Sequence, residues 1–83
     1  MYLHLGENTV VKSSDIIGIF DIENTSVGRI TKDFLSSAGK NGKVVNVSYE
    51  MPKSFILCLD KGGGKTVYIS QISCSTLRKR AKA

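Results

Sequence analysis

A run of cations near the C-terminus is the strongest chemical feature of this 83-residue sequence. Its members are Arg78, Lys79, Arg80 and Lys82, whereas residues 1–77 hold eight Lys/Arg against seven Asp/Glu. Guanidinium and ammonium groups bind phosphate oxygens, with an affinity that falls as the salt concentration rises. The run therefore predicts contact with a polyanion, strengthened where several copies are held together. An ordinary solvated C-terminus accounts for it equally well.

The segment Lys61-Gly62-Gly63-Gly64-Lys65-Thr66 has the composition of a phosphate-binding loop. Such a loop needs a glycine five positions before Gly64, where this chain has Leu59, and it must open a helix. Residues 66–70 instead alternate apolar and polar side chains, which predicts a strand. We therefore interpret residues 61–65 as a flexible hairpin tip and expect no nucleotide site.

No catalytic centre and no metal site are expected. His4 is the single histidine, and nothing in the sequence favours a nucleophile or an orienting carboxylate beside it. Cys58 lies in an apolar run and is most simply a core residue, while Cys74 has no Cys or His at metal-ligand spacing. We predict a protein that is not an enzyme, with no cofactor and no small-molecule substrate.

The first half of the chain is expected to form a hairpin, a strand and a helix. Tyr2–Leu5 and Thr9–Lys12 flank a Gly-Glu-Asn turn. Residues 16–20 are apolar at positions facing both ways, which predicts a strand covered on each side, with Gly18 allowing a close approach. One helix is expected between Ile22 and Lys43, where apolar residues fall at helical spacing. Its stripe is Val27, Ile30, Phe34, Leu35 and Ala38, with Thr25 or Ser26 as N-cap and Gly39 after its end.

The second half adds three strands and a short helix. Val45, Val47 and Tyr49 alternate with polar residues as in a half-buried strand, and residues 55–59 and 66–70 form a hairpin. Ser73 or Ser75 is expected to cap a last helix that runs into the basic residues. The prediction is an α+β fold, with a small, mostly antiparallel sheet, one central helix and a short C-terminal helix. Residues 1–77 form its single domain and residues 78–83 a basic C-terminal tail.

One central helix cannot cover both faces of such a sheet. Residues 16–20 and 55–59 are apolar on both strand faces, so part of their surface needs another cover. We therefore expect the second face to be buried between subunits of a homo-oligomer.

The composition is that of a folded protein, with 41% hydrophobic and 23% charged residues. No apolar run approaches the roughly 18–20 residues of a membrane-spanning helix, so no membrane residence is expected. The first residues contain neither a basic leader nor an apolar signal core, and a cytoplasmic location with reduced cysteines is therefore expected.

Several segments, in order and spacing over nearly the whole chain, resemble the RemA/RemB family of extracellular-matrix regulators, on its RemB-like branch. They are residues 2–6 (YLHLG) with Val10-Val11, residues 15–21 (DIIGIFD), residues 52–54 (PKS) and residues 75–81 (STLRKRA).

The resemblance implies a bacterial cytoplasmic protein without enzymatic activity that helps to control biofilm-matrix genes. RemA-like proteins bind double-stranded DNA, assemble into rings and have a fold similar to LytTR DNA-binding domains, so these properties are the expectation here. RemA-like chains also carry an arginine-rich loop after the tyrosine that matches Tyr49. At that place this sequence has Glu50-Met51-Pro52-Lys53, and Lys53 is its cation.

The resulting hypothesis is a non-enzymatic, oligomeric transcription regulator that binds DNA mainly through backbone phosphates. The expected contacts are Lys53, Arg78, Lys79, Arg80 and Lys82, with Lys12, Arg29 and Lys32 as secondary candidates.

Two alternatives stay open. The first is a structural or protein-interaction module without direct DNA binding, whose basic run docks on an acidic protein or keeps the assembly soluble. The second is an RNA binder that stacks bases on Tyr49 and Tyr68, which requires both rings on one sheet face.

Overall fold

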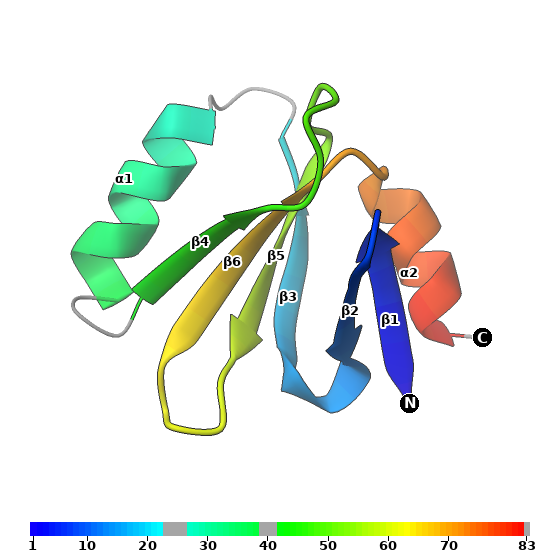
Figure 1. Cartoon of the computed structure of the whole chain (residues 1–83), viewed down its shortest axis with the longest axis horizontal. Coiled ribbons are helices and arrows are strands. Elements are labelled where there is room, and N and C mark those ends of the chain that lie inside the picture. The colour runs from blue at the N-terminus through cyan, green and yellow to red at the C-terminus, as the bar shows by residue number, and fades with distance from the viewer. Residues whose placement is uncertain (23–26, 39–41, 83) are drawn as a thin grey trace.

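The computed structural model describes residues 1–22, 27–38 and 42–82 (Figure 1). The elements in chain order are β1 (Tyr2–Gly6), β2 (Thr9–Lys12), a 3-10 turn (Ser13–Asp15), β3 (Ile16–Asp21), α1 (Val27–Ala38), β4 (Gly42–Asn46), β5 (Ser54–Leu59), β6 (Lys65–Ser70) and α2 (Cys74–Lys82). The predicted α+β class, the opening hairpin, the central helix and the short C-terminal helix are confirmed. The proposed caps of the central helix, Thr25, Ser26 and Gly39, lie outside the described residues.

The strands form two sheets instead of the single expected one. β1 and β2 pair as an antiparallel hairpin, and the other four strands lie in the order β3-β5-β6-β4. The β3–β5 and β5–β6 pairs are antiparallel, whereas β4 runs parallel to β6. The antiparallel β5–β6 hairpin confirms the tip predicted at residues 61–65, except that Lys65 already begins β6. The residues after the tip form a strand, not the helix of a nucleotide-binding loop.

The prediction that residues 16–20 form a strand covered on both sides is wrong. β3 lies at an edge of the four-stranded sheet, and the Ile17 and Phe20 side chains are 53% and 44% exposed. Ile16 and Ile19 do pack against the core cluster. The close approach at Gly18 is made by a side chain, since a Cβ there would lie 2.5 Å from Cζ of Phe20. The ring of Phe20 thus occupies the space above the glycine.

The predicted strand through Val45, Val47 and Tyr49 is too long. β4 ends at Asn46, and Val47 is buried just beyond it, where its N–H donates to the Ile69 carbonyl. The chain then turns, with the N–H of Glu50 bonded to the Ser48 hydroxyl at 3.1 Å. The hydroxyl bond favours a turn over a continued strand, which leaves Tyr49 fully exposed.

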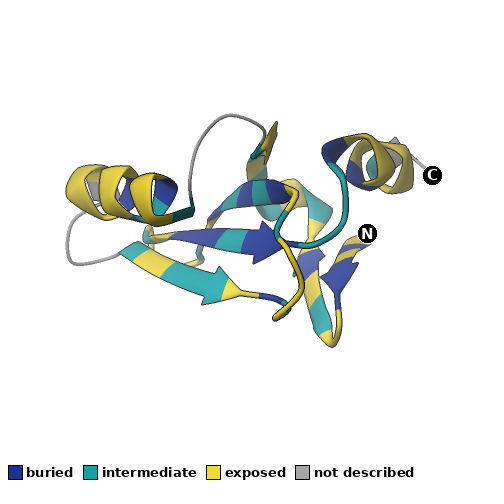
Figure 2. Ribbon diagram, turned by 90° about the horizontal axis from the view of Figure 1, so that it is seen from above, coloured by how far each residue is buried: buried dark blue, intermediate teal, exposed yellow. Residues whose placement is uncertain are grey.

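The two faces of the four-stranded sheet have different covers, because side chains alternate along each strand. Ile56, Cys58 and Tyr68 belong to the face that packs against the hairpin and α2. Phe55, Leu57 and Val67 belong to the other face, where they line a groove with α1. Figures 1 and 2 show the two helices at opposite ends of the molecule.

Two buried serines join the hairpin and α2 to the sheet. Ser54 and Ser70 are opposite each other on β5 and β6, and neither is exposed. The Ser70 hydroxyl donates to the Leu5 carbonyl at 2.6 Å and accepts from the Ile72 N–H at 3.0 Å, while the Ser54 hydroxyl donates to the Ile72 carbonyl at 2.7 Å. The hydroxyls therefore hold β1 and the start of α2 in register with the sheet.

The substitution Ser70→Ala is expected to lower the free energy of unfolding by about 2 kcal/mol, because it leaves the buried Leu5 carbonyl and the partly buried Ile72 N–H without their partner. Urea unfolding followed by circular dichroism measures the loss. The matched variant Ser75→Ala, at an exposed position of α2, should change the stability by no more than about 0.5 kcal/mol. Equal stability of the two variants would contradict the assignment.

Candidate nucleic-acid interface

The helix α2 begins with a serine cap and buries one apolar side. The Ser73 hydroxyl accepts a hydrogen bond from the Thr76 N–H at 3.3 Å, which satisfies one of the free donors of the first turn. Cys74 and Leu77 are buried and Ala81 is partly buried against the same core, as expected for positions three and four residues apart on a helix. This packing fixes which side of α2 faces solvent.

The solvent side of α2 carries the basic run. Arg78, Lys79 and Arg80 are all exposed, and α2 contains no acidic residue. Across residues 1–22, 27–38 and 42–82, the one ion pair within 4.0 Å joins Arg29 to Asp33, so the described carboxylates do not neutralise these three cations. The helix therefore presents concentrated positive charge to solvent.

Two of these cations also hold the helix in place. Arg78 Nη2 donates to the Ile19 carbonyl of β3 at 3.1 Å, and Arg80 Nη1 donates to the His4 carbonyl of β1 at 3.3 Å. Sequence reasoning missed these bonds, which join residues 59 and 76 positions apart. Lys79 lies between the two arginines with no such bond to the described chain, so its ammonium is available to a ligand.

Lys53 lies near the start of α2. Its N–H donates to the Ser70 carbonyl at 2.8 Å and its carbonyl accepts from the Ile22 N–H at 3.0 Å. The next residue, Ser54, is bonded to Ile72, two positions before the helix. The exposed side chain of Lys53 thus belongs to the end of the sheet at which α2 begins.

The three secondary candidates, Lys12, Arg29 and Lys32, lie away from Lys53 and α2. Lys12 ends β2 and lines a hollow with Lys61 at the far end of β5 from Lys53. Arg29 and Lys32 are on α1, which packs on the opposite face of the sheet, and Arg29 pairs with Asp33 at 3.8 Å. Among the predicted cations outside α2, Lys53 is the one that shares the end of the sheet at which α2 begins.

The histidine has a local structural contact. His4 Nε2 donates to the Glu7 carbonyl across the hairpin turn at 2.7 Å, and Glu7 has a positive φ of 46°. No group of three or more His, Cys, Asp or Glu side chains within the described residues is arranged to hold a metal ion.

Cys58 is buried in the core, as predicted, and is not a reactive thiol. Burial raises its pKa from 9.0 to about 11, with smaller contributions from Asp15 and Asp60. Burial, together with nearby charges, also raises the pKa of Tyr68. At neutral pH the Cys58 thiol is therefore protonated, which disfavours nucleophilic chemistry.

This raised pKa predicts a loss of stability in alkali. The folded protein holds the thiol proton more tightly than the unfolded chain does, so the stabilisation is complete below pH 9 and disappears as the pH rises toward 11. Urea unfolding of the wild type at several pH values should show a steeper decline over this range than unfolding of Cys58→Ala. Parallel declines would contradict the assignment.

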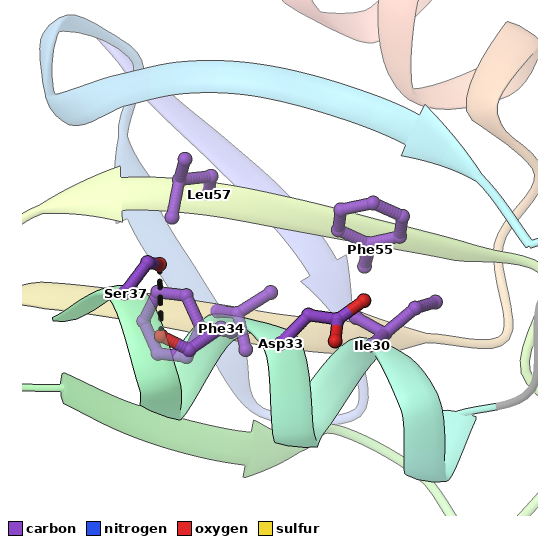
Figure 3. A pocket seen from close by; sticks show the side chains of 7 residues that line it. Ile30, Asp33, Phe34, Ser37, Phe55 and Leu57 are labelled. Carbon is purple, nitrogen blue, oxygen red and sulfur yellow. Dashed lines mark hydrogen bonds between the residues drawn. The ribbon is translucent and has the colours of Figure 1, made fainter. Parts of the chain in front are cut away.

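The structure also has an apolar groove that sequence reasoning did not locate. Its volume is about 370 Å³, and its lining is mainly Ile30, Phe34, Phe55, Leu57 and Val67, with Asp33 and Ser37 from α1 (Figure 3). The exposed ring of Phe20 stacks on Phe55, with ring centroids 5.0 Å apart. The sequence feature that could have indicated this groove is the apolar character of residues 55–59 on both strand faces.

None of the helices in the described part of the chain has the length and apolarity needed to cross a membrane.

Comparison with known proteins extends over almost the whole chain. Residues 2–81 match the RemA-like family, described as extracellular matrix regulatory protein A-like. The chain is also 38% identical to extracellular matrix regulatory protein B of Bacillus subtilis (strain 168), over 82 residues that cover 99% of this chain and 91% of the relative. The predicted resemblance is confirmed, and the chain belongs to the RemA-like family of extracellular matrix regulatory proteins.

Proposed function

We propose that this protein is a non-enzymatic transcription regulator that binds double-stranded DNA through its phosphates, with α2 as the contacting element. The observation that supports it most is the exposed cationic side of α2, which no described carboxylate neutralises. Membership in a family of matrix regulators supports a role in the control of extracellular-matrix genes.

The chemistry of the surface favours backbone contact over base recognition. Lys79, Arg78 and Arg80 offer donors to successive phosphates, and Lys53 adds a cation near the start of the helix. The exposed residues between the cap and the cations, Ser75 and Thr76, are short and polar, so they can also donate to phosphate oxygens. A cytoplasmic location and a LytTR-like fold form part of this proposal.

Fluorescence anisotropy of a labelled random-sequence duplex tests the function. The full chain should bind this duplex at low salt without any specific site, because phosphate contacts are independent of sequence. Absence of binding at low salt, with the fold intact by circular dichroism, would contradict the proposal.

Self-association is part of the same proposal. α1 leaves the β3–β5 half of its sheet face open, where Phe20 is 44% exposed and Leu57 is half-buried. A second copy is the simplest cover for this apolar surface. In a closed assembly such as a ring, several α2 helices would contact one DNA molecule, which raises avidity without new types of contact.

A second candidate function is a protein-interaction module. It is favoured by the loop after β4, where Tyr49 is fully exposed and Met51 is 83% exposed beside Glu50. Large apolar side chains in such a setting commonly anchor protein partners. Capture of one defined protein that resists nuclease treatment and is lost in Tyr49→Ser would favour this function over DNA binding.

The RNA hypothesis requires the rings of Tyr49 and Tyr68 on one face of a sheet. This requirement is not met, because Tyr68 packs toward the core cluster while Tyr49 lies beyond the end of β4.

A further inference from the structure

Lys79 lies on the outermost line of the solvent side of α2. Successive residues of an α-helix are about 100° apart around its axis. Cys74 and Leu77 face the core, so Lys79 falls almost opposite their common direction. Ser75 and Thr76, four and three positions earlier, are exposed on the same outer side. Since helical side chains lean toward the N-terminus, these two hydroxyl-bearing residues are neighbours of the Lys79 side chain.

The two arginines lie on either side of Lys79 and are held there. Each is about 100° from Lys79 around the helix. Each also donates a hydrogen bond to a strand carbonyl, at 3.1 Å for Arg78 and at 3.3 Å for Arg80. A guanidinium has several N–H donors, so both arginines keep donors for an anion. A small phosphate group that approaches the outer side of α2 therefore meets cations on both sides of the Lys79 amine.

Two other exposed lysines have acidic neighbours instead. Lys12 and Lys61 line one hollow, and Asp15 and Asp60 line it too. α2 contains no acidic residue, and none of the described carboxylates forms an ion pair with its exposed cations. Carboxylates repel an anionic reagent, whereas a cluster of cations raises its local concentration. Exposure alone does not distinguish these lysines from Lys79, because all three side chains are exposed.

We propose that small acyl phosphates, such as acetyl phosphate, acylate the Lys79 amine without an enzyme, and that this modification weakens DNA binding. The cations of α2 hold the phosphate group of the reagent as they hold a DNA phosphate, which places the acyl group near the amine. This inference rests on the proposed DNA binding and adds a means of regulating the same surface.

The reaction is an acyl transfer that needs no further reactant. The unprotonated amine of Lys79 attacks the carbonyl carbon of the acyl phosphate, and an amide bond forms. The bond between that carbon and the bridging oxygen breaks, and inorganic phosphate leaves with the electron pair. The proton released by the nitrogen passes to phosphate or to water. The side chain thereby loses its positive charge, and with it a charge-assisted contact to DNA.

Peptide mapping by mass spectrometry tests the site. After brief treatment of the folded full chain with acetyl phosphate, the acetylated fraction at Lys79 should exceed the fractions at Lys12 and Lys61 about tenfold. Acetic anhydride, which is uncharged, should acetylate the three lysines to within about threefold of one another. Added salt should reduce the preference seen with acetyl phosphate, because it screens the cations. Absence of a preference, or an equal preference with both reagents, would overturn the proposal.

Fluorescence anisotropy with the random-sequence duplex tests the consequence. Wild-type protein acetylated at Lys79 should bind about tenfold more weakly at low salt, because one charge-assisted contact is lost. Circular dichroism should show an unchanged fold, since Lys79 is exposed. The variant Lys79→Arg has no amine to acylate at this position, so the same treatment should not lower its own starting affinity.

The outcomes separate this inference from the DNA-binding proposal. Unchanged duplex affinity after acetylation of Lys79 would overturn the regulation and leave DNA binding intact. A wild type that binds no duplex before treatment would overturn DNA binding and the regulation together. In that case the acetylation preference for Lys79 would still decide whether the modification site exists.

Discussion

Replacement of Leu77 by alanine is expected to lower the free energy of unfolding by about 3 kcal/mol, the largest stability effect that we predict for one residue. Leu77 has no exposed surface and belongs to the core cluster shared by the hairpin, β5 and α2. Its removal leaves a cavity where α2 meets the sheets. The loss is a large share of the total, because the free energy of unfolding of a small domain is only about 5–15 kcal/mol.

The loss can be measured by urea unfolding of the full chain. Lys79→Ala, two positions further along α2 and exposed, is the matched control and should change the stability by less than about 0.5 kcal/mol. A Leu77→Ala variant that unfolds at the same urea concentration as the control would contradict the packing of α2 described above. Where Leu77→Ala still folds, its duplex affinity should also fall, because α2 is less firmly placed.

The second large effect concerns DNA. The double substitution Lys79→Gln with Lys82→Gln is expected to weaken binding to a random-sequence duplex about 100-fold at low salt, since each charge-assisted hydrogen bond contributes roughly 1.5 kcal/mol. Fluorescence anisotropy measures the change. These two lysines are preferred over the arginines because Arg78 and Arg80 also bond to strand carbonyls, so their loss would disturb the fold.

The matched control removes the same charge elsewhere. Lys61→Gln with Lys65→Gln changes one residue of the β5–β6 turn and the first residue of β6, at the far end of the sheet from Lys53. Its affinity should stay within about threefold of the wild type, because only the long-range field changes. Equal losses in both double variants would show that net charge, and not the α2 surface, controls binding. Truncation after Leu77 is a poorer test, since it also removes Ala81 from the core and both arginine contacts.

Most elements of the fold could be predicted because their signals are local. The helical spacing of Val27, Ile30 and Phe34 gives α1, and the apolar run at 55–59 gives β5. The end of β4 was predicted wrongly because alternation continues to Tyr49, while the Ser48 hydroxyl turns the chain. The place of β3 at a sheet edge follows from long-range pairing, which residue type alone does not reveal.

The candidate site was predictable in part for the same reason. The run from Arg78 to Lys82 is visible in the sequence, and so is the serine that caps its helix. The hydrogen bonds from Arg78 to Ile19 and from Arg80 to His4 could not be predicted from the sequence, because they depend on how α2 packs on strands far away in the chain. The separation of Arg29 and Lys32 from α2 likewise depends on which sheet face each helix covers.

The salt dependence of duplex binding tests the central claim most directly. The logarithm of the affinity should fall linearly with the logarithm of the salt concentration, and Lys79→Gln with Lys82→Gln should reduce that slope by about two, close to 0.9 for each lost phosphate contact. The Lys61→Gln with Lys65→Gln control should keep the slope of the wild type. Identical slopes for all three proteins would contradict phosphate contact through α2.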